Sequence, residues 1–288
     1  MLVECVVNLS EGRDAACLER LDAAAGPLLL DRHSDQDHHR SVYTLVGEGE
    51  EIAVATRSLA ALAVELLDLR AHAGAHPRLG VIDVVPFVPY VLGDDPPRHP
   101  GSVVPLRDEF ARWLGTELGV PSFLYGPLPG GGLRTLPEVR RSAFGEIAAD
   151  FGPSQPHLSA GACAVGARTV LVAYNVWVSS REVAKAVATL IRGPAVRALG
   201  LEVGDRAQVS CNLIDPSALG PLELYDEVAA KVVDAGATVL GGELVGLLPT
   251  TVLDAIPRRR WDELGLSAES SIESRLAAPR AATGTGLA

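Results

Sequence analysis

The chain has 288 residues, of which 48% are hydrophobic and 21% are charged. This is the composition of an ordinary globular protein, and the length allows one large domain or two of ordinary size. The formal net charge is −11, and arginine supplies the positive charge apart from Lys185 and Lys231. Because phosphate contacts supply most non-specific affinity for nucleic acids, this charge argues against nucleic acid or an anionic membrane as a partner.

The cysteines and the N-terminus indicate the compartment. Cys5, Cys17, Cys163 and Cys211 lie far apart and form no CxxC pair, which excludes a zinc ribbon. Isolated cysteines of this kind are typical of small buried side chains in a reducing compartment. The N-terminus lacks the basic and apolar segments of a signal peptide, and no apolar stretch reaches the roughly 18 residues of a membrane span. We therefore expect a cytoplasmic protein.

In the first part of the chain, apolar patterns predict a β-α-β-β-α-β order. Ser10 is a plausible N-cap for the first helix, with Glu11 in its first turn. The predicted elements are a strand at 2–8, the helix after Ser10, strands at 27–31 and 40–47, a helix at 50–69 and a strand at 80–89. A further helix is predicted at 102–120 and a strand at 120–126. A capping box of Thr135 and Glu138 then predicts the start of another helix.

The second part of the chain repeats the order. Ser180 is a plausible N-cap for its first helix, and Gly236 is expected to end its second helix. The predicted elements are strands at 168–178, 199–203, 207–215 and 238–249 and helices at 179–192 and 221–236. Two such runs predict the α/β (α+β) class, with two ferredoxin-like β-α-β-β-α-β lobes. The end of the chain, 276–288, has low complexity and is expected to be disordered.

Three segments of the chain could contribute to a functional site. In residues 28–44, between two strands, ten positions hold Asp31, His33, Asp35, Asp37, His38, His39 and Arg40. Such a cluster is either a solvated polar loop or part of a site. Residues 150–168 hold glycines and prolines before a strand, so a flat ligand can approach the backbone closely, unless the segment is only a linker. Their spacing fits neither GxGxxG nor the P-loop, so no nucleotide is indicated.

The third segment, RAHAGAHPRLG at 70–80, contains His72 and His76. Their spacing matches a metal-binding pair on a helix, but Gly74 weakens a helix here and Pro77 keeps His76 out of helical dihedrals. His76 is better interpreted as an imidazole in extended backbone, able to exchange a proton near neutral pH. Most histidines in loops have no catalytic role, so the residues alone leave both readings open.

Several separated motifs together resemble the formiminotransferase family, and they fall in family order over roughly residues 2–255. The residues that carry the resemblance are VECVVNLSEG (3–12), DRHSDQDHHRSVYTLVG (31–47), HAGAHPRLGVIDVVPFVP (72–89), FLYG (123–126), RTLPEVR (134–140), DFGPSQPHLSAGACAVGAR (150–168), VAYN (172–175), QVSCNLID (208–215) and ELVGLLP (243–249).

The resemblance implies an N-terminal subdomain at 1–166, a C-terminal subdomain at 167–275 and a substrate cleft between them. It implies transfer of the formimino group of N-formiminoglutamate to N5 of tetrahydrofolate, with folate as co-substrate and no metal. In the family the histidine of the HPR motif is the acid/base, which is His76 here. The family's folate-lining segment corresponds to Gly152, Pro153, Ser154, Gln155, Pro156, His157, Leu158, Ser159, Ala160 and Gly161.

Further candidates follow from the chemistry of the substrates. His33 and Asp31 would assist His76 if their loops meet in the cleft. Both substrates carry carboxylates, which arginine pairs through two hydrogen bonds. The candidate substrate-binding residues are Asn8, Arg40, Arg78 and Arg168. Relatives are dimers, so a homodimer is expected.

This sequence departs from the family pattern at several points. Relatives fused to a cyclodeaminase have aspartate at the position of His33, asparagine is expected at His39, and Ala160 replaces a tryptophan. The stretch 191–210 is shorter than in relatives, and the cyclodeaminase domain is absent. Three alternatives stay open: formyl transfer involving 5-formyltetrahydrofolate or N-formylglutamate, a folate-binding protein without turnover, and a metal-dependent hydrolase. The hydrolase would use His33, Asp35, His72 and His76.

Overall fold

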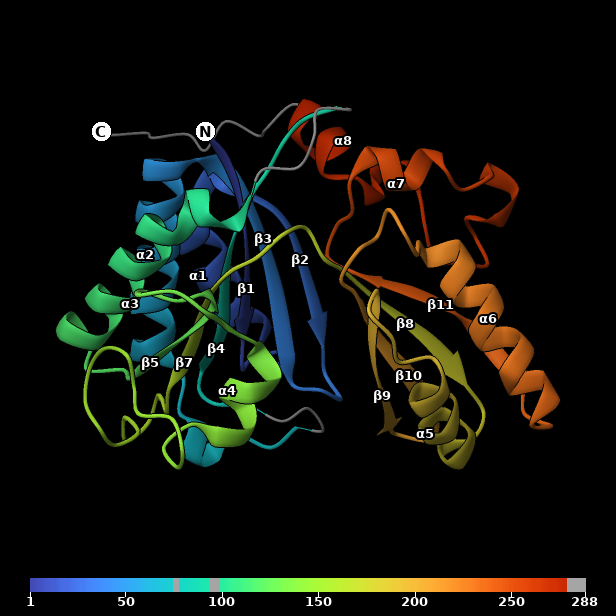
Figure 1. Cartoon of the computed structure of the whole chain (residues 1–288), viewed down its shortest axis with the longest axis horizontal. Helices are drawn as coiled ribbons and strands as arrows, with labels where there is room; N and C mark the ends of the chain where they lie inside the picture. The colour runs from blue at the N-terminus through green and yellow to red at the C-terminus, as the bar shows by residue number, and fades with distance from the viewer. Residues whose placement is uncertain (75–77, 94–98, 279–288) are drawn as a thin grey trace.

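The chain forms two lobes, each built on a β-sheet with helices packed against its outer face (Figure 1). The computed structural model describes residues 1–74, 78–93 and 99–278. Within this part of the chain no helix is suited to crossing a membrane. Lobe 1 comprises the elements up to residue 167, and lobe 2 those from residue 172 onward. The predicted α/β class with two lobes is confirmed.

In the described residues of lobe 1, seven strands form one sheet in the order β2-β3-β1-β4-β7-β5-β6. β7 pairs in parallel with β4 and β5, and the other pairs are antiparallel. The strands are β1 Leu2–Leu9, β2 Leu29–Asp35, β3 Arg40–Glu48, β4 Ile82–Pro89, β5 Ser122–Pro127, β6 Leu133–Arg134 and β7 Cys163–Ala167. The helices are α1 Ala15–Ala25, α2 Gly49–Leu66, α3 Val104–Glu117 and α4 Leu136–Ser142.

The alternation of side chains along the strands decides which face of the lobe 1 sheet is buried. On β1, Val3, Cys5, Val7 and Leu9 are fully buried against α1, α2 and α3. The residues between them, 4, 6 and 8, point to the opposite face, where they line a cavity. One strand therefore supplies both the core of lobe 1 and the wall of the cavity.

Lobe 2 repeats the β-α-β-β-α-β order of the first six elements of lobe 1. The described residues form a four-stranded antiparallel sheet in the order β11-β8-β10-β9, which matches β4-β1-β3-β2 in lobe 1. The elements are β8 Val172–Val178, α5 Arg181–Leu190, β9 Val196–Val203, β10 Arg206–Leu213, α6 Pro221–Asp234, β11 Val239–Val245, α7 Thr250–Asp254 and α8 Ile272–Ala277. Lobe 2 therefore has the β-α-β-β-α-β order predicted from the sequence, and a ferredoxin-like lobe stays a prediction.

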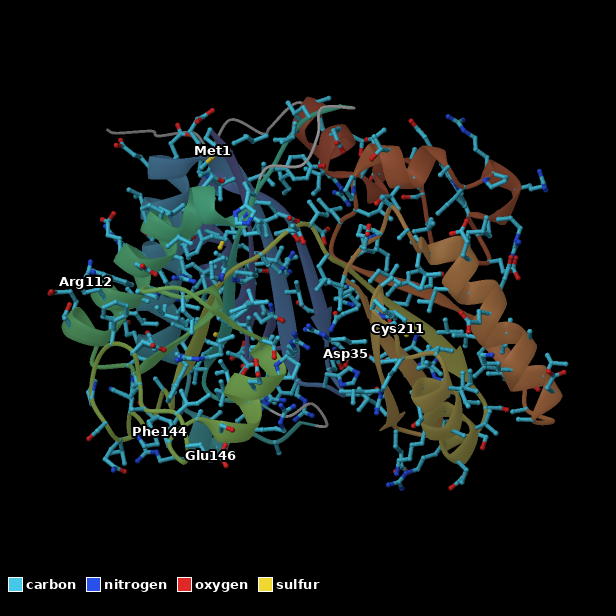
Figure 2. All side chains as sticks on the ribbon, in the orientation of Figure 1. Met1, Asp35, Arg112, Phe144, Glu146 and Cys211 are labelled. Atoms are coloured by element: carbon cyan, nitrogen blue, oxygen red, sulfur yellow. The ribbon has the colours of Figure 1, made fainter. Side chains whose placement is uncertain are left out.

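The two lobes touch through one apolar and one polar contact. Val46 and Tyr90 of lobe 1 pack with Leu247 and Ile272 from the C-terminal part of the chain. At the polar contact, residues of the β2–β3 hairpin meet β10 and β11. With all side chains drawn, Asp35 at the end of β2 is seen between the lobes (Figure 2). These contacts leave an open space between the two sheets.

Some predicted boundaries are wrong for identifiable reasons. Ser10 does not cap α1, because β1 continues to Leu9 and the Ser10 hydroxyl donates to the carbonyl of Gly80 (2.8 Å). Asp14 is the N-cap instead, accepting from two backbone N–H groups. The strand predicted at 27–31 begins later and runs to Asp35. The capping box at Thr135 and the N-cap at Ser180 are confirmed. Residues 279–288 of the predicted disordered tail lie outside the described residues.

Candidate functional site

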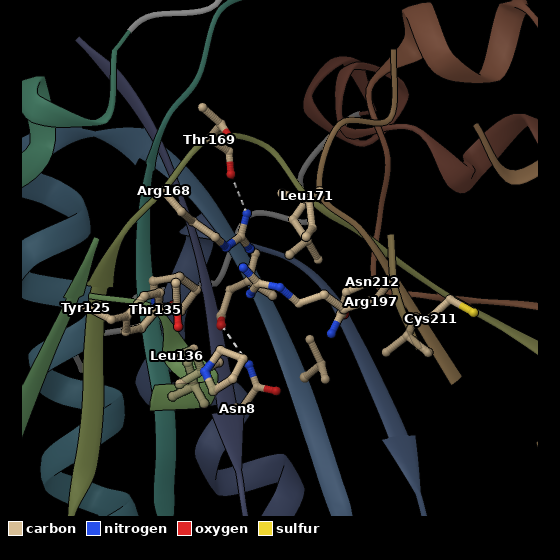
Figure 3. Close-up of a pocket in the computed structure, with 18 of the residues that line it drawn as sticks. Asn8, Tyr125, Thr135, Leu136, Arg168, Thr169, Leu171, Arg197, Cys211 and Asn212 are labelled. Atoms are coloured by element: carbon tan, nitrogen blue, oxygen red, sulfur yellow. Dashed lines mark hydrogen bonds between the residues drawn. The ribbon is translucent and has the colours of Figure 1, made fainter. Parts of the chain in front are cut away.

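A cavity of about 950 Å³ lies between the two sheets. Lobe 1 lines it with side chains that include Asn8 and Val42, and lobe 2 with Asn175 and Gln208. Figure 3 shows Asn8 and Arg168 on the lobe 1 side and Arg197, from β9 of lobe 2, reaching toward them. The volume is within the range of roughly 300–1,000 Å³ common for small-molecule sites. A cavity of small-molecule size therefore lies between the two lobes.

The lining of this cavity is strongly basic, although the chain as a whole carries a net charge of −11. Among the described residues, the charged lining consists of two acidic side chains, Glu4 and Asp35, and seven arginines: Arg40, Arg134, Arg140, Arg141, Arg168, Arg192 and Arg197. A wall of one charge with an apolar floor concentrates ligands of the opposite charge. The cavity is therefore suited to anionic ligands.

Two of these arginines are held by aspartates of lobe 1. Arg134 pairs with Asp150 and Arg140 with the buried Asp83, each at 2.6 Å. Within the described part of the chain, the other five make no ion pair with a carboxylate: Arg40, Arg141, Arg168, Arg192 and Arg197. Guanidinium groups of this kind are available to pair the carboxylates of a ligand.

Arg40 has the most restricted environment of the five. Its Nε is buried and has no hydrogen-bond acceptor in the described structure. Burial, together with the neighbouring positive charges of Arg140 and Arg78, lowers its pKa to about 10 against the opposing pull of Asp83 and Asp35. The guanidinium therefore stays charged at neutral pH, and a ligand carboxylate would provide the missing acceptor.

Glu4 on β1 is a buried carboxyl group in the cavity wall, with 2% of its surface exposed. Its Oε2 has no hydrogen-bond partner among the described residues. Burial raises its pKa to about 7, against the lowering effect of Arg168. Near neutral pH, Glu4 is therefore close to an equal mixture of acid and carboxylate.

His33 faces lobe 2 across the polar contact. Its Nε2 lies 3.5 Å from Oε1 of Glu243 on β11. Burial lowers the pKa of His33, but the hydrogen bond and charge of Glu243 outweigh burial and raise it above the usual 6.5. The other carboxylate oxygen of Glu243 accepts from Asn175, Trp177 and Gln208 at 3.0–3.1 Å. His33, one of the two predicted assisting residues, is thus engaged by a carboxylate of the other lobe.

The remaining predicted polar residues fall into two groups. Asn8 and Arg168 line the cavity; Asn8 donates to the carbonyl of Val6 (2.9 Å). Asp31 and Arg78 do not line it. Asp31 lies 3.6 Å from Arg275 of α8, and burial raises its pKa despite that arginine. The structure therefore brings Asn8, His33, Arg40 and Arg168 together around one space, with Asp31 and Arg78 outside it.

His76, the predicted acid/base, lies outside the described residues, but the residues flanking segment 75–77 are described. Gly74 lies directly on the carbonyl of His38, only 2.3 Å from where a β-carbon on residue 74 would be. The guanidinium of Arg78 also donates to that carbonyl at 3.0 Å. Since His38 lines the cavity, both ends of the segment abut a residue of the cavity wall.

The predicted folate segment, residues 152–161, does not line the cavity. It contacts described residues before and after segment 75–77: Leu69 donates to the Ser159 carbonyl (2.7 Å) and Val81 to the Ala160 carbonyl (3.0 Å). Residues 152–156 are exposed, and so is Leu158. Leu69 and Val81 therefore contact the predicted folate segment, whereas Gly74 and Arg78 contact His38 of the cavity wall.

Several residues around the cavity are not predicted from the sequence. Arg140 lies within the quoted RTLPEVR motif, but nothing in the motif indicates that it faces a cavity. Arg192 and Arg197 come from the other lobe and have no local signal. Glu4 does have one, because a carboxylate inside the apolar run LVECVVN requires either a partner or a function.

A metal site built on the predicted histidines has little geometric support. In the part of the chain that the structure describes, no three His, Cys, Asp or Glu side chains converge to hold an ion. His72 accepts a hydrogen bond at Nε2 from Arg78, so this nitrogen is occupied, and the cation beside it would repel a metal. His33 and Asp35 line the cavity instead.

Comparison with known proteins assigns the family. Residues 2–168 match the N-terminal subdomain of the formiminotransferase domain, and residues 167–258 match the formiminotransferase domain. A glutamate formimidoyltransferase of Streptococcus pyogenes serotype M1 is 35% identical over 88% of this chain and 90% of its own length. A glutamate formimidoyltransferase of Thermoplasma acidophilum is 33% identical over 88% and 89%.

A longer relative shows the same region within a larger protein. The formimidoyltransferase-cyclodeaminase of Sus scrofa is 35% identical over 88% of this chain, which spans 51% of that protein. Matches to both family models and to relatives of this identity extend over nearly all of the two lobes. The chain therefore belongs to the formiminotransferase family.

Proposed function

We propose that this chain transfers the formimino group of N-formiminoglutamate to N5 of tetrahydrofolate, giving 5-formiminotetrahydrofolate and glutamate. The observation that carries the proposal is the arginine-rich cavity between the lobes, whose His38 wall adjoins both ends of the segment containing His76. Both substrates are dicarboxylates. Relatives named glutamate formimidoyltransferase support the same reaction.

The chemistry requires one proton to be removed and one to be delivered. The N5 lone pair attacks the formimino carbon, and a tetrahedral intermediate forms. His76 would take the N5 proton and return a proton to the glutamate nitrogen as its bond to carbon breaks. A well-placed general acid/base of this kind contributes about 10²–10⁴ in rate. Holding the two substrates together contributes at least as much.

The geometry suggests where each part of the substrates binds. Arg40 and Arg168, with Asn8, would hold carboxylate and polar groups within the cavity. The folate would lie along residues 152–161, which are largely exposed and contact Leu69 and Val81. Gly74 and Arg78, which flank the segment containing His76, both contact His38 of the cavity wall. Arg78 is committed to backbone carbonyls and would act on the substrates only indirectly.

The first test is release of glutamate from N-formiminoglutamate, with and without tetrahydrofolate, by the wild type and by His76→Ala. Folate-dependent release that the substitution lowers by two or more orders of magnitude is expected from the loss of an acid/base. If the wild type binds tetrahydrofolate in calorimetry but releases no glutamate, the proposal fails. The next substrate would then be 5-formyltetrahydrofolate, which distinguishes formyl transfer from binding without turnover.

The setting of the reaction is part of the proposal. Formimino transfer to folate belongs to histidine breakdown and one-carbon metabolism, which we place in the cytoplasm. All four cysteines are free thiols, consistent with a reducing compartment. We further propose that the chain acts as a homodimer, with no metal, and that residues 1–166 and 167–275 are its two subdomains. Light scattering of the purified chain tests the dimer.

A further inference from the structure

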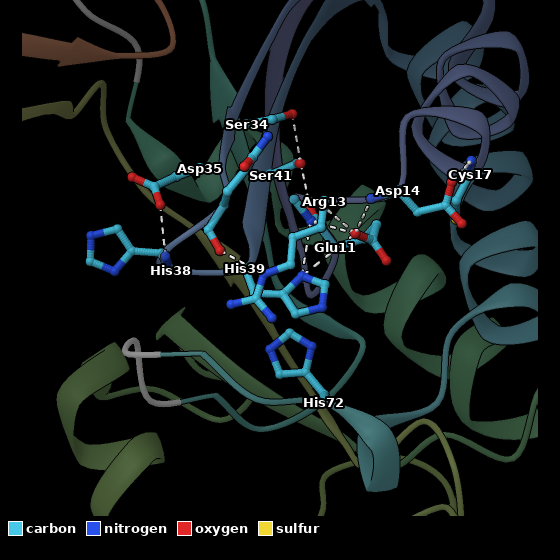
Figure 4. Close-up of polar contacts among 12 residues, drawn as sticks. Glu11, Arg13, Asp14, Cys17, Ser34, Asp35, His38, His39, Ser41 and His72 are labelled. Carbon is cyan, nitrogen blue, oxygen red and sulfur yellow. Dashed lines mark hydrogen bonds and ion pairs between the residues drawn. The ribbon is translucent and has the colours of Figure 1, made fainter. Parts of the chain in front are cut away.

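Three segments meet beside the cavity in a cluster of histidines and charged side chains (Figure 4). They are the loop after β1, with Glu11; the β2–β3 turn, with His38 and His39; and the stretch before β4, with His72 and Arg78. Figure 4 shows the rings of His39 and His72 facing one another. Their centroids are 4.2 Å apart and the rings are stacked.

Arg78 holds the stretch before β4 on the turn. Its Nη2 donates to the carbonyl of His38 (3.0 Å) and its Nη1 to that of His39 (3.2 Å). Nη1 also donates to Nε2 of His72. Because a guanidinium can only donate, His72 must be neutral at Nε2, with its proton on Nδ1.

The charge environment keeps His72 in this neutral form. Burial, with the nearby charge of Arg78 and the ring of His39, lowers its pKa to about 4. His72 is therefore neutral near neutral pH. At neutral pH it therefore accepts the hydrogen bond from Arg78 and does not exchange protons with a substrate.

His39, whose ring stacks on that of His72, is held in place by the loop after β1. His39 has a positive φ of 47°, a conformation that His, Asn and Asp adopt more readily than other side chains. This accounts for histidine at a position where asparagine is expected. Its Nδ1 accepts from the backbone of Gly12 (3.2 Å), and the carboxylate of Glu11 accepts from three successive backbone N–H groups at 2.6–2.9 Å. The stack thus rests on an ordered loop.

We propose that His72 is a positioning residue. Its neutral ring, stacked on His39, holds Arg78 on the carbonyls of the β2–β3 turn, and Gly74 lies on the same turn. The two described ends of segment 75–77 are thereby fixed against the cavity wall. The inference rests on the proposed function in one respect, namely that His76 in this segment is the acid/base.

The test compares His72→Leu and His72→Gln in the full chain, with Arg70→Gln as the matched control. Gln retains an acceptor oxygen near the position of Nε2, whereas Leu does not. Arg70 is exposed in the neighbouring turn and pairs with Asp68. Steady-state kinetics for both substrates, the pH profile of kcat/KM, and hydrogen exchange of peptides covering 69–81 are measured for each variant.

For His72→Leu we expect kcat to fall about 10- to 100-fold, as misplacement of a catalytic group produces, with KM for tetrahydrofolate within about twofold. His72→Gln recovers most of kcat, and Arg70→Gln matches the wild type. The acid limb of the pH profile stays in place, because His72 does not titrate there. Hydrogen exchange of the peptides covering 69–81 becomes faster in His72→Leu but not in His72→Gln or Arg70→Gln.

The inference is overturned if His72→Leu keeps its kcat, or if the acid limb moves, since His72 would then itself exchange protons. A uniform loss of melting temperature with faster exchange throughout the chain would show a general folding defect and also overturn it. If the wild type transfers no formimino group, the proposed function fails separately. In that case hydrogen exchange of the peptides covering 69–81 still tests the positioning role. If the exchange rate is unchanged in His72→Leu, the positioning role is refuted.

Discussion

The buried carboxyl of Glu4 makes the stability of the chain depend on pH in a predictable direction. Its pKa is 4.5 in an ordinary environment and about 7 in the folded chain, where burial raises it. The native state therefore holds this proton more tightly than the unfolded state. Stability is lost as pH rises from about 4.5 through about 7, and the loss is constant above that range.

The size of the effect follows from the two pKa values. At about 1.4 kcal/mol per pH unit, a rise from 4.5 to about 7 corresponds to about 3 kcal/mol at pH values above both. Near pH 5 the loss of stability caused by Glu4 is only about 1 kcal/mol. The substitution Glu4→Gln places a neutral group of the same shape in the wall. It should therefore stabilise the chain by up to about 3 kcal/mol near pH 8 and by much less near pH 5.

Urea unfolding followed by circular dichroism, at intervals from about pH 5 to pH 9, measures this difference. Glu19→Gln, which changes an exposed glutamate of α1, is the control and should follow the wild type at every pH. If wild type and Glu4→Gln keep a constant difference in the free energy of unfolding from about pH 5 to pH 9, Glu4 does not titrate as described. The account of its burial would then be wrong.

Three other predictions concern a helix cap, the polar contact between the lobes and the cavity. Asp14→Ala removes the side chain that caps α1 and should cost about 1 kcal/mol in urea unfolding, whereas no change would show that the cap is dispensable. Because the pKa of His33 is raised in the folded chain, its pairing with Glu243 stabilises fully below about pH 6.5, and this stabilisation is lost as pH rises through the folded pKa. Glu243→Gln should therefore destabilise the chain more near pH 6 than near pH 9. An equal effect at both pH values would contradict the pairing. Arg197→Gln should raise KM for a carboxylate substrate about tenfold, and added salt should reduce this difference. Arg181→Gln is the control, because Arg181 forms an exposed ion pair in the same lobe, and its KM should not change. Equal KM values for the two variants would argue against anion binding at Arg197.

Most elements of the two lobes could be predicted because they carry strong local patterns. The apolar run of β1 and the capping box at Thr135 each determine structure through neighbours in the sequence. β7, Cys163–Ala167, is not predictable in this way. Its sequence CAVGA has small side chains with little preference for strands, and it is a strand because it lies between β4 and β5.

The site is less accessible to prediction than the fold. The motif around His76 and the crowded polar segment at residues 31–40 indicate where chemistry is concentrated. The basic wall of the cavity depends on side chains far apart in sequence, such as Arg40 and Arg197, which meet only when the lobes face one another. Likewise, the sequence shows that His33 is polar and near a strand end, but its partner Glu243 is more than 200 residues away.

The alternation along β1 separates two kinds of evolutionary change. Positions 3, 5, 7 and 9 are committed to the core of lobe 1, whereas positions 4, 6 and 8 face the cavity. On β10 of lobe 2, residues 207, 209 and 213 are likewise buried among the core side chains, residues 208, 210 and 212 line the cavity, and Cys211 belongs to both sets. Mutations at the cavity positions can alter which anion is bound while the two cores remain intact. Descendants of such a protein can thus acquire new substrates at little cost to folding.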